Sequence, residues 1–155
     1  MRLNKRGREM IAKDIMKTRV ITVSPLTPIS EAALLMKNED IGALVIVNNE
    51  ENPIDIITDR DIIVSVVANR ENPEEILVED VMTKKLGSRK LIVVGEDTDV
   101  FDILKILSKN SIRRVPVTRR GKLVGIVSVD DIVVVVATEL ANLASTLSGG
   151  PSRVI

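Results

Sequence analysis

The chain has no cysteine and no histidine, and its 155 residues include one phenylalanine but no tyrosine or tryptophan. Without cysteine and histidine it lacks thiol nucleophiles, disulfides, the usual zinc ligands and histidine-based acid–base catalysis. With Phe101 as its single aromatic residue, it also lacks the stacking platforms on which single-stranded nucleic acids are commonly bound. These absences disfavour several classes of enzyme and a single-strand-binding protein.

Long apolar runs and a net charge are also missing. The longest apolar stretch, Ile132–Ala137, is too short to span a bilayer, and no signal-peptide pattern opens the sequence, so we expect a soluble cytoplasmic protein. Basic and acidic residues number 22 each, so the chain has no net positive charge that would attract a polyanion. Seven basic residues nevertheless occur in the first 20 positions, namely Arg2, Lys5, Arg6, Arg8, Lys13, Lys17 and Arg19. They indicate either a solvated N-terminal arm, assigned to residues 1–11, or an arm that contacts an anion or an acidic partner.

The sequence repeats itself. Asp14-Ile15-Met16 recurs as Asp80-Val81-Met82, at an offset of 66 residues. Three further blocks follow in the same order: 21–23 with 92–94, 41–47 with 112–118, and 56–62 with 126–132. The extra residues of the second copy fall in the basic loop Thr83–Leu91. Four ordered matches indicate an internal duplication.

Both copies show the same pattern of expected elements, which is strand, helix, strand, strand, helix. The first strands are expected at about 20–23 and 91–94, the first helices at 28–38 and 99–109, and the closing helices at 59–69 and 129–147. The paired strands are expected at 43–48 with 53–57 and at 114–118 with 123–127. Thr27 is the expected N-cap of the first helix, and Asp97 or Thr98 that of its counterpart.

One copy alone, with roughly sixty residues, is marginal for independent stability. We therefore predict an α/β fold of two tandem β-α-β-β-α repeats packed about a pseudo-twofold axis. Repeat 1 is assigned to residues 12–70, repeat 2 to 78–147, and a flexible C-terminal tail to 148–155.

The most specific motif is Thr58-x-x-Asp61 and its duplicate Ser128-x-x-Asp131, each where a strand leads into a helix. Such a pair forms a capping box that satisfies the amides of the first helical turn. The same geometry presents a hydroxyl and free amides to a phosphate, and a carboxylate that can accept from a ribose diol. The residues by themselves leave both interpretations open.

The segment Gly125-Ile126-Val127-Ser128-Val129-Asp130-Asp131 resembles the Gly-h-h-Ser/Thr-x-x-Asp signature of cystathionine-β-synthase-type (CBS) repeats, where h is apolar. The Asp-Ile/Val-Met blocks and Arg114-Val115-Pro116-Val117 are similar to that family as well, and the resemblance spans residues 12 to about 140. It implies that Thr58 and Ser128 approach phosphate and that Asp61 and Asp131 hold ribose. It also implies an adenine pocket lined by the first and middle strands, at Thr22, Val23, Val93, Val94, Val45, Ile46, Pro116 and Val117.

The copies differ at two positions of this pattern. The first copy has Asp55 where the family favours glycine, which would crowd or recharge its pocket, and Gly42-Ala43 where the second copy has Arg113-Arg114. Arginine can clamp phosphate through charge-assisted hydrogen bonds, although both side chains could equally be solvated. We assign Arg113 or Arg114 as the phosphate clamp without assigning its pocket, and we expect two unequal sites.

The resemblance implies a regulatory module, not an enzyme, that binds AMP, ADP, ATP or S-adenosylmethionine and signals to an unknown partner protein. It further implies a homodimer that uses the exposed apolar surface of the two late helices. No obligatory cofactor or metal site is expected. A nucleotide hydrolase is disfavoured because no phosphate-loop glycine pattern or metal cluster is present. The alternative is a structural or nucleic-acid-binding protein that uses the basic arm.

Overall fold

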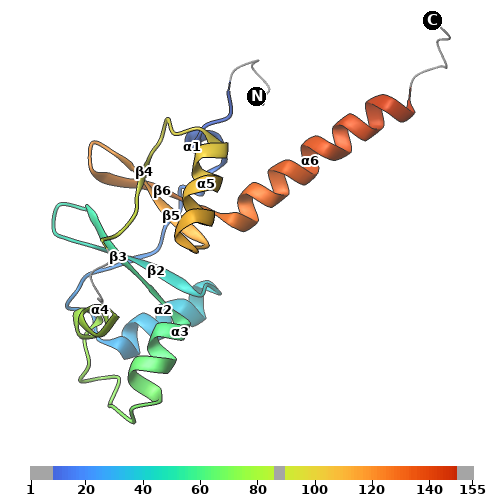
Figure 1. Cartoon of the computed structure of the whole chain (residues 1–155). Coiled ribbons are helices and arrows are strands. Elements are labelled where there is room, and N and C mark those ends of the chain that lie inside the picture. Colours follow the sequence, from blue (N-terminus) through green and yellow to red (C-terminus); the bar gives the residue numbers. More distant parts are fainter. Residues whose placement is uncertain (1–8, 86–89, 150–155) are drawn as a thin grey trace, which may run out of the picture.

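The computed structural model describes residues 9–85 and 90–149, and it contains two three-stranded sheets that lie one above the other (Figure 1). Most of the basic arm, the loop residues 86–89 and the tail residues 150–155 lie outside the described part of the chain. The first sheet has the order β1-β2-β3, and the second has the order β4-β5-β6. The strands are β1 (Thr22–Val23), β2 (Ala43–Val47), β3 (Pro53–Thr58), β4 (Val94–Gly95), β5 (Arg114–Arg119) and β6 (Lys122–Ser128).

The two sheets have the same pairing. In each sheet the first strand runs parallel to the middle strand, and the third runs antiparallel to it. The register is equivalent, since Ala43 is paired with Thr58 and Arg114 with Ser128. The predicted tandem α/β architecture is therefore confirmed.

Helices α2 (Ile29–Glu39) and α5 (Val100–Asn110) cross over between the parallel strands of their sheets. Each buries one stripe of apolar side chains, as the spacing of these residues predicts, whereas Ala33 and Leu104 face solvent. The buried stripes are Ile29, Ala32 and Met36 on α2, and Val100, Ile103 and Leu107 on α5.

The predicted caps of these helices are wrong. At α2 the N-cap residue is Pro28, and Thr27 Oγ1 instead accepts a hydrogen bond from the Ser24 amide at 3.2 Å. Carbonyls from a distant segment satisfy the first amides, because Ile29 N donates to Ile76 O and Ser30 N to Pro73 O, both at 2.9 Å. At α5 the cap is Asp99, whose carboxylate accepts from the Phe101 amide at 2.8 Å, and not Asp97 or Thr98.

Two further helices, α1 (Ala12–Ile15) and α4 (Val78–Lys85), begin the two sequence copies and were not predicted. Ala12, at the start of the first copy, is buried in the core of the second sheet, while Val78 and Val81, at the start of the second copy, are buried in the core of the first sheet. Figure 1 shows α1 beside α5 and α4 beside α2. Each copy thus completes the core of the other, which fastens the halves together.

The closing helices of the two copies differ. In the first copy α3 (Asp59–Ile62) passes into the π-helical turn η1 (Ile63–Val67), where one continuous helix was predicted. In the second copy α6 (Val129–Ser148) runs for 20 residues, one residue beyond its predicted end, and Gly149 is its C-cap. The outer part of α6 projects away from both sheets (Figure 1). By length and composition it is the one helix among the described residues that could cross a membrane, with a mean hydropathy of 1.4, and 6% of it is buried.

Candidate functional site between the two copies

Both Ser/Thr-x-x-Asp motifs form capping boxes. Thr58 Oγ1 accepts from the Asp61 amide at 3.2 Å, and Asp61 Oδ2 accepts from the Thr58 amide at 2.8 Å. At the second motif the corresponding bonds are 3.1 and 3.0 Å, and the Ser128 hydroxyl also donates to Asp131 Oδ2 at 2.9 Å. Both motifs therefore have a structural role, on which any ligand contact would be superimposed.

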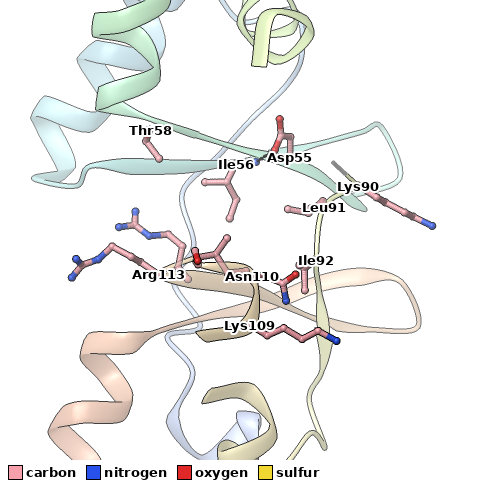
Figure 2. Close-up of a pocket in the computed structure, with 12 residues that line it drawn as sticks. Asp55, Ile56, Thr58, Lys90, Leu91, Ile92, Lys109, Asn110 and Arg113 are labelled. Atoms are coloured by element: carbon pink, nitrogen blue, oxygen red, sulfur yellow. Dashed lines mark hydrogen bonds between the residues drawn. The ribbon is translucent and has the colours of Figure 1, made fainter. Parts of the chain in front are cut away.

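A cavity of about 650 Å³ opens between the two sheets, and we call it the inter-copy pocket (Figure 2). Its size lies in the range of small-molecule sites. One side is formed by β3 of the first copy, and the other by the segment before β4 and the turn between α5 and β5. The lining residues are Asp55, Ile56, Thr58, Lys90, Leu91, Ile92, Lys109, Asn110, Ser111, Ile112, Arg113 and Arg114.

The pocket brings together three of the predicted site residues. Thr58 comes from the end of β3 in the first copy, whereas Arg113 and Arg114 come from the start of β5 in the second. The arginines therefore share a pocket with the first-copy threonine, and not with the serine of their own copy. Arg113 also lies 3.5 Å from Asp130 in an exposed ion pair, which is weak enough to exchange for a ligand contact.

The other predicted site residues lie outside this lining. Thr22 and Val93 are exposed, and Asp61, Ser128 and Asp131 are half-buried at the two caps. The remainder are buried in the sheets, namely Val23, Val45, Ile46, Val94, Pro116 and Val117. Their assignment to a ligand stays a prediction.

Sequence reasoning missed the residues that form most of the pocket wall. Leu91 and Ile92 line it just before β4, where Val93 and Val94 were expected. The turn Lys109–Ile112 lines it because Ser111 ends α5 in a left-handed conformation (φ 53°) and redirects the chain toward the first copy. A C-cap pattern in the sequence would have indicated this turn, although serine is a weak signal for it.

The pocket wall is basic. It has four cationic residues, Lys90, Lys109, Arg113 and Arg114, against the single carboxylate of Asp55. The duplication provides equivalent residues in the other half of the repeat, and we call them the counterpart face. They are Arg19, Glu39, Asp40 and Ser128, the equivalents of Lys90, Asn110, Ser111 and Thr58. Arg19 Nη2 lies 2.6 Å from Glu39 Oε2 there. The four cations favour an anionic ligand in the inter-copy pocket.

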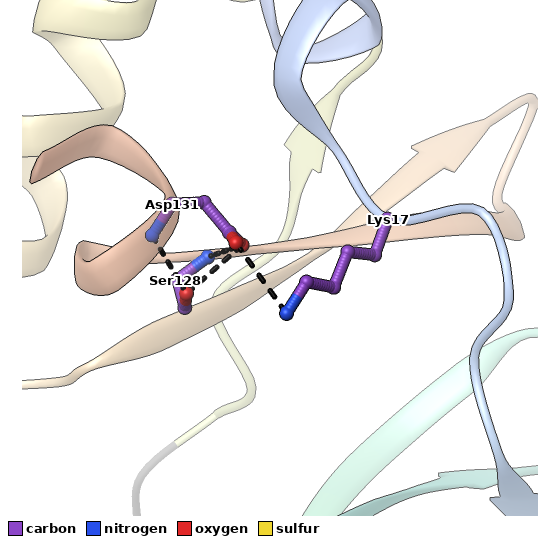
Figure 3. A network of polar contacts seen from close by, with 3 residues as sticks. All are labelled: Lys17, Ser128 and Asp131. Atoms are coloured by element: carbon purple, nitrogen blue, oxygen red, sulfur yellow. Dashed lines mark hydrogen bonds and ion pairs between the residues drawn. The ribbon is translucent and has the colours of Figure 1, made fainter. Parts of the chain in front are cut away.

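At the second capping box the N-terminal segment of the chain lies against the motif (Figure 3). The Lys17 amide and carbonyl each bond to Ile126 of β6 at 3.0 Å, and Lys17 Nζ lies 3.5 Å from Asp131 Oδ1. Asp131 is thus engaged by a lysine as well as by its own cap.

The glycine of the family signature is explained by the same segment. A Cβ at Gly125 would lie 2.5 Å from Met16 Sδ and 3.0 Å from the Lys17 carbonyl oxygen. Gly125 therefore permits close packing of residues 16–17 on β6. Its equivalent Asp55 lines the inter-copy pocket, and its predicted effect on that pocket stays a prediction.

Within the residues that the structure describes, no group of three or more Asp or Glu side chains could hold a metal ion. The pocket wall combines hydroxyl and cationic groups with apolar side chains. Such groups can bind and orient a ligand.

The comparisons with known proteins agree with this geometry. The CBS domain family matches residues 12–68 and 78–138, so the two copies together account for most of the chain. The chain belongs to the CBS domain family. The resemblance carried by the Gly-h-h-Ser/Thr-x-x-Asp segments is thereby confirmed, and CBS domain pairs are commonly regulatory and ligand-binding modules.

Two relatives and one solved structure place the chain more closely. It is 38% identical over 126 residues to an uncharacterized protein of Methanopyrus kandleri, covering 81% of this chain and 62% of that protein. It is 35% identical to a CBS domain-containing protein of Bacillus subtilis, covering 79% and 82%. A CBS domain pair solved in complex with 5′-methylthioadenosine and S-adenosyl-L-methionine has 30% identity and a TM-score of 0.69, covering 84% of this chain and 98% of that one.

Proposed function

We propose that this CBS domain pair is a cytoplasmic regulatory module that binds an adenine nucleotide, AMP, ADP or ATP, in the inter-copy pocket. It would signal occupancy to a partner protein and would not turn the ligand over. The observation that carries the proposal is the basic wall, with Lys90, Lys109, Arg113 and Arg114 against Asp55. S-adenosylmethionine is the second candidate, since a similar CBS pair was solved with it.

The two candidates differ in charge. Phosphate oxygens accept charge-assisted hydrogen bonds from arginine and lysine. S-adenosylmethionine instead carries a net charge of about +1, from a sulfonium and an ammonium cation against one carboxylate, and four nearby cations disfavour this net positive charge. The charge of this pocket therefore supports a nucleotide over S-adenosylmethionine.

The arrangement of the wall suggests how a nucleotide would lie. Thr58 Oγ1 accepts from the Asp61 amide, and a hydroxyl that accepts one bond still has a hydrogen to donate to a phosphate oxygen. Arg113 stands opposite Thr58 across the pocket (Figure 2), and Arg114 lines the same pocket. Ile56, Leu91, Ile92 and Ile112 supply apolar contacts for the adenine ring.

A ligand in this position would contact both copies at once. It would therefore favour the arrangement of the two copies in which Thr58 and the arginines face each other. A ligand shifts a conformational equilibrium only when it binds one state better than another, and contacts from both halves provide such a difference. Dimers are common among CBS pairs, and we propose a homodimer through which this shift reaches an effector protein.

The alternative is nucleic-acid binding through the basic arm, whose basic residues lie outside the described part of the chain. Lys17 and Arg19, which follow the arm, pair with Asp131 and Glu39 within the chain. Measurable DNA or RNA binding with a steep salt dependence, together with no heat from any adenosyl ligand, would overturn our proposal in its favour.

Calorimetric titration with AMP, ADP, ATP and S-adenosylmethionine tests the proposal. The duplication offers a matched pair of variants, Thr58→Ala and Ser128→Ala, which remove the same cap and cost about 1 kcal/mol of stability each. We expect Thr58→Ala to weaken nucleotide binding by about 10- to 100-fold, the range for a hydrogen bond to a charged group. We expect Ser128→Ala to leave binding unchanged. Equal effects of the two variants, or no binding by the unmodified protein, would contradict the proposal.

The ribose role implied by the family needs its own pair of variants. Asp61→Ala and Asp131→Ala each remove a capping carboxylate, and we expect at least one to weaken nucleotide binding markedly. If neither changes the affinity, both aspartates act as helix caps alone.

A further inference from the structure

The cations of the inter-copy pocket form two separate groups. Figure 2 shows Thr58 and Arg113 at one end of the pocket, and we call this the arginine end, which includes the adjacent Arg114. It shows Lys90 and Lys109 at the other end, the lysine end. Both lysines are exposed, and their side chains extend away from Thr58. A compact phosphate group at Thr58 therefore meets the arginines and leaves the lysines to bind another group.

The two ends are separated along β3. Thr58 lies at the arginine end of this strand, and Asp55 lies at the lysine end (Figure 2). The step from residue 55 to residue 58 spans about 10 Å in an extended strand. One phosphate group is too small to contact both ends. The wall as a whole therefore suits a ligand with two anionic groups that stand apart.

The two ends differ in net charge. The lysine end includes the carboxylate of Asp55, whose Oδ1 accepts a hydrogen bond from the Ile56 amide at 2.8 Å. The arginine end has no carboxylate among the residues that line the pocket, since Asp130, which lies 3.5 Å from Arg113 in an exposed ion pair, is outside the lining. Both ends are therefore positive, the arginine end more so, and each favours an anionic group.

The rest of the pocket wall is mostly aliphatic. Its side chains are Ile56, Leu91, Ile92 and Ile112, with the polar Asn110 and Ser111 beside them. A phosphate placed over aliphatic side chains loses hydration without gaining a partner, which costs free energy. The uncharged part of the ligand therefore belongs on this wall, and its anionic groups belong at the two ends. A dinucleoside polyphosphate has the reverse order, because its phosphates lie between two bases.

An adenosine with phosphates at two positions of its ribose has the required order. The 5′-phosphate and a phosphate on the 2′ or 3′ hydroxyl leave the ribose in different directions, and the uncharged adenine extends from a third position. The family resemblance assigns the ribose hydroxyls to Asp61, but this carboxylate accepts from the Thr58 amide at 2.8 Å and lies outside the lining. Within the lining, the group at the far end from Thr58 is the lysine end.

We propose that the preferred ligand of the inter-copy pocket is an adenosine that carries a second phosphate on its ribose, at the 2′ or 3′ position, in addition to its 5′-phosphate. This inference rests on the nucleotide site proposed above and names the class of nucleotide. Thr58 and the two arginines bind the 5′-phosphate, while Lys90 and Lys109 bind the phosphate on the ribose through charge-assisted hydrogen bonds.

Calorimetric titration of the full chain compares ligands that have two phosphates in different places. ADP has both at its 5′ end, whereas adenosine 3′,5′-bisphosphate and adenosine 2′,5′-bisphosphate each have one on the ribose. We expect at least one bisphosphate to bind about 10-fold more tightly than ADP, because two exposed lysines can each add a few-fold to the affinity. The isomer that binds more tightly identifies the hydroxyl. Binding of both isomers no tighter than that of ADP would overturn the proposal.

Two double variants separate contact with the lysines from general attraction between charges. Lys90→Ala with Lys109→Ala should weaken binding of the preferred bisphosphate about 10-fold and binding of ADP less than about threefold. Lys105→Ala with Lys122→Ala removes the same two charges from exposed positions of the second copy outside the lining, and it should keep the preference. Equal losses for ADP and the bisphosphate in the first variant, or equal losses of bisphosphate affinity in the two variants, would overturn the proposal.

Two further arms distinguish the source of the ligand and the level at which a failure occurs. Coenzyme A carries an adenosine with a 3′-phosphate and a substituted 5′-diphosphate, so tighter binding of coenzyme A than of free adenosine 3′,5′-bisphosphate would support the proposal with a coenzyme as the source. The reverse order would support it with a free nucleotide as the source. Binding of AMP and ADP without any gain from a phosphate on the ribose would overturn this inference and leave the nucleotide site intact. No binding of any adenosine phosphate would overturn both.

Discussion

The inter-copy pocket and the counterpart face are built from equivalent segments of a duplicated chain, yet they carry opposite charge. The pocket has four basic residues and one carboxylate, whereas the counterpart positions provide Arg19 against Glu39 and Asp40. The backbone is preserved, since Asp40 and Ser111 end α2 and α5 with φ of 52° and 53°. Divergence after duplication has thus kept the scaffold and changed the electrostatics of one face.

The position of the signature glycine also has a packing role in one copy and a pocket-lining role in the other. Gly125 belongs to the second copy but accommodates the N-terminal segment, and Asp55 belongs to the first copy but faces the pocket. A complete signature therefore need not mark the copy that binds. The arginines of one copy line the same pocket as the threonine of the other, so the proposed ligand would contact both copies.

The largest effect is expected when Gly125 of the second copy is replaced by aspartate, the residue at the equivalent position, Asp55, of the first copy. Gly125→Asp places a Cβ and a carboxylate where Met16 and the Lys17 carbonyl lie, at 2.5 and 3.0 Å. We expect a loss of about 2–3 kcal/mol or more in the free energy of unfolding, measured by urea denaturation, because an overpacked site must move backbone. The reverse change, Asp55→Gly, is the matched control. A wild-type stability for Gly125→Asp would show that residues 16–17 do not pack on β6.

The next effect concerns the basic wall. Arg113→Ala with Arg114→Ala should weaken ADP binding by about 10- to 100-fold, because hydrogen bonds to charged groups contribute about 1.5–3 kcal/mol. Arg119→Ala with Arg120→Ala, at the end of β5 and in the turn that follows it, forms the control pair outside the inter-copy pocket. Calorimetry in increasing salt should show the affinity of the unmodified protein falling and that of the double variant falling less. Equal affinity in the two double variants would remove the arginines from the site.

Much of the fold could be predicted from the sequence, because the internal repeats and the spacing of apolar residues are visible within short segments. The two copies, the β-α-β-β-α order and the buried stripes of α2 and α5 follow from spacing alone. The packing of α1 and α4 in the core of the other copy could not be predicted from the sequence. Asp14–Met16 and Asp80–Met82 look like the beginnings of their own copies, and only tertiary packing reveals that each completes the other core.

The site was less accessible than the fold. Thr58, Arg113 and Arg114 were identified, but their meeting in one pocket depends on how the sheets face each other, which no local pattern encodes. The caps were also misassigned for a non-local reason. Carbonyls of Pro73 and Ile76 satisfy the start of α2, and Thr27 is left to bond within its own turn.

A charge swap can sharpen the comparison between the two faces. Glu39→Asn with Asp40→Ser gives the counterpart face the residues that the pocket has at Asn110 and Ser111. It also releases Arg19 from its ion pair. We expect weak additional nucleotide binding at high ligand concentration, so that the calorimetric stoichiometry rises above one per chain. Lys37→Ala serves as a control on the same helix. A stoichiometry that stays at one would mean that shape, and not charge, distinguishes the two faces.

The smallest effect is expected from the ion pair itself. Arg19 is largely exposed, with 79% of its side chain accessible against 27% for Glu39, so solvent screens most of the attraction despite the 2.6 Å separation. Arg19→Ala should lower the free energy of unfolding by less than about 1 kcal/mol, and the loss should shrink further in high salt. A double-mutant cycle with Glu39→Gln isolates the pair from other effects of each side chain. A coupling well above this range would show that the pair fastens the segment before β1 to the end of α2 at the counterpart face, and would assign that face a structural role in place of a lost binding site.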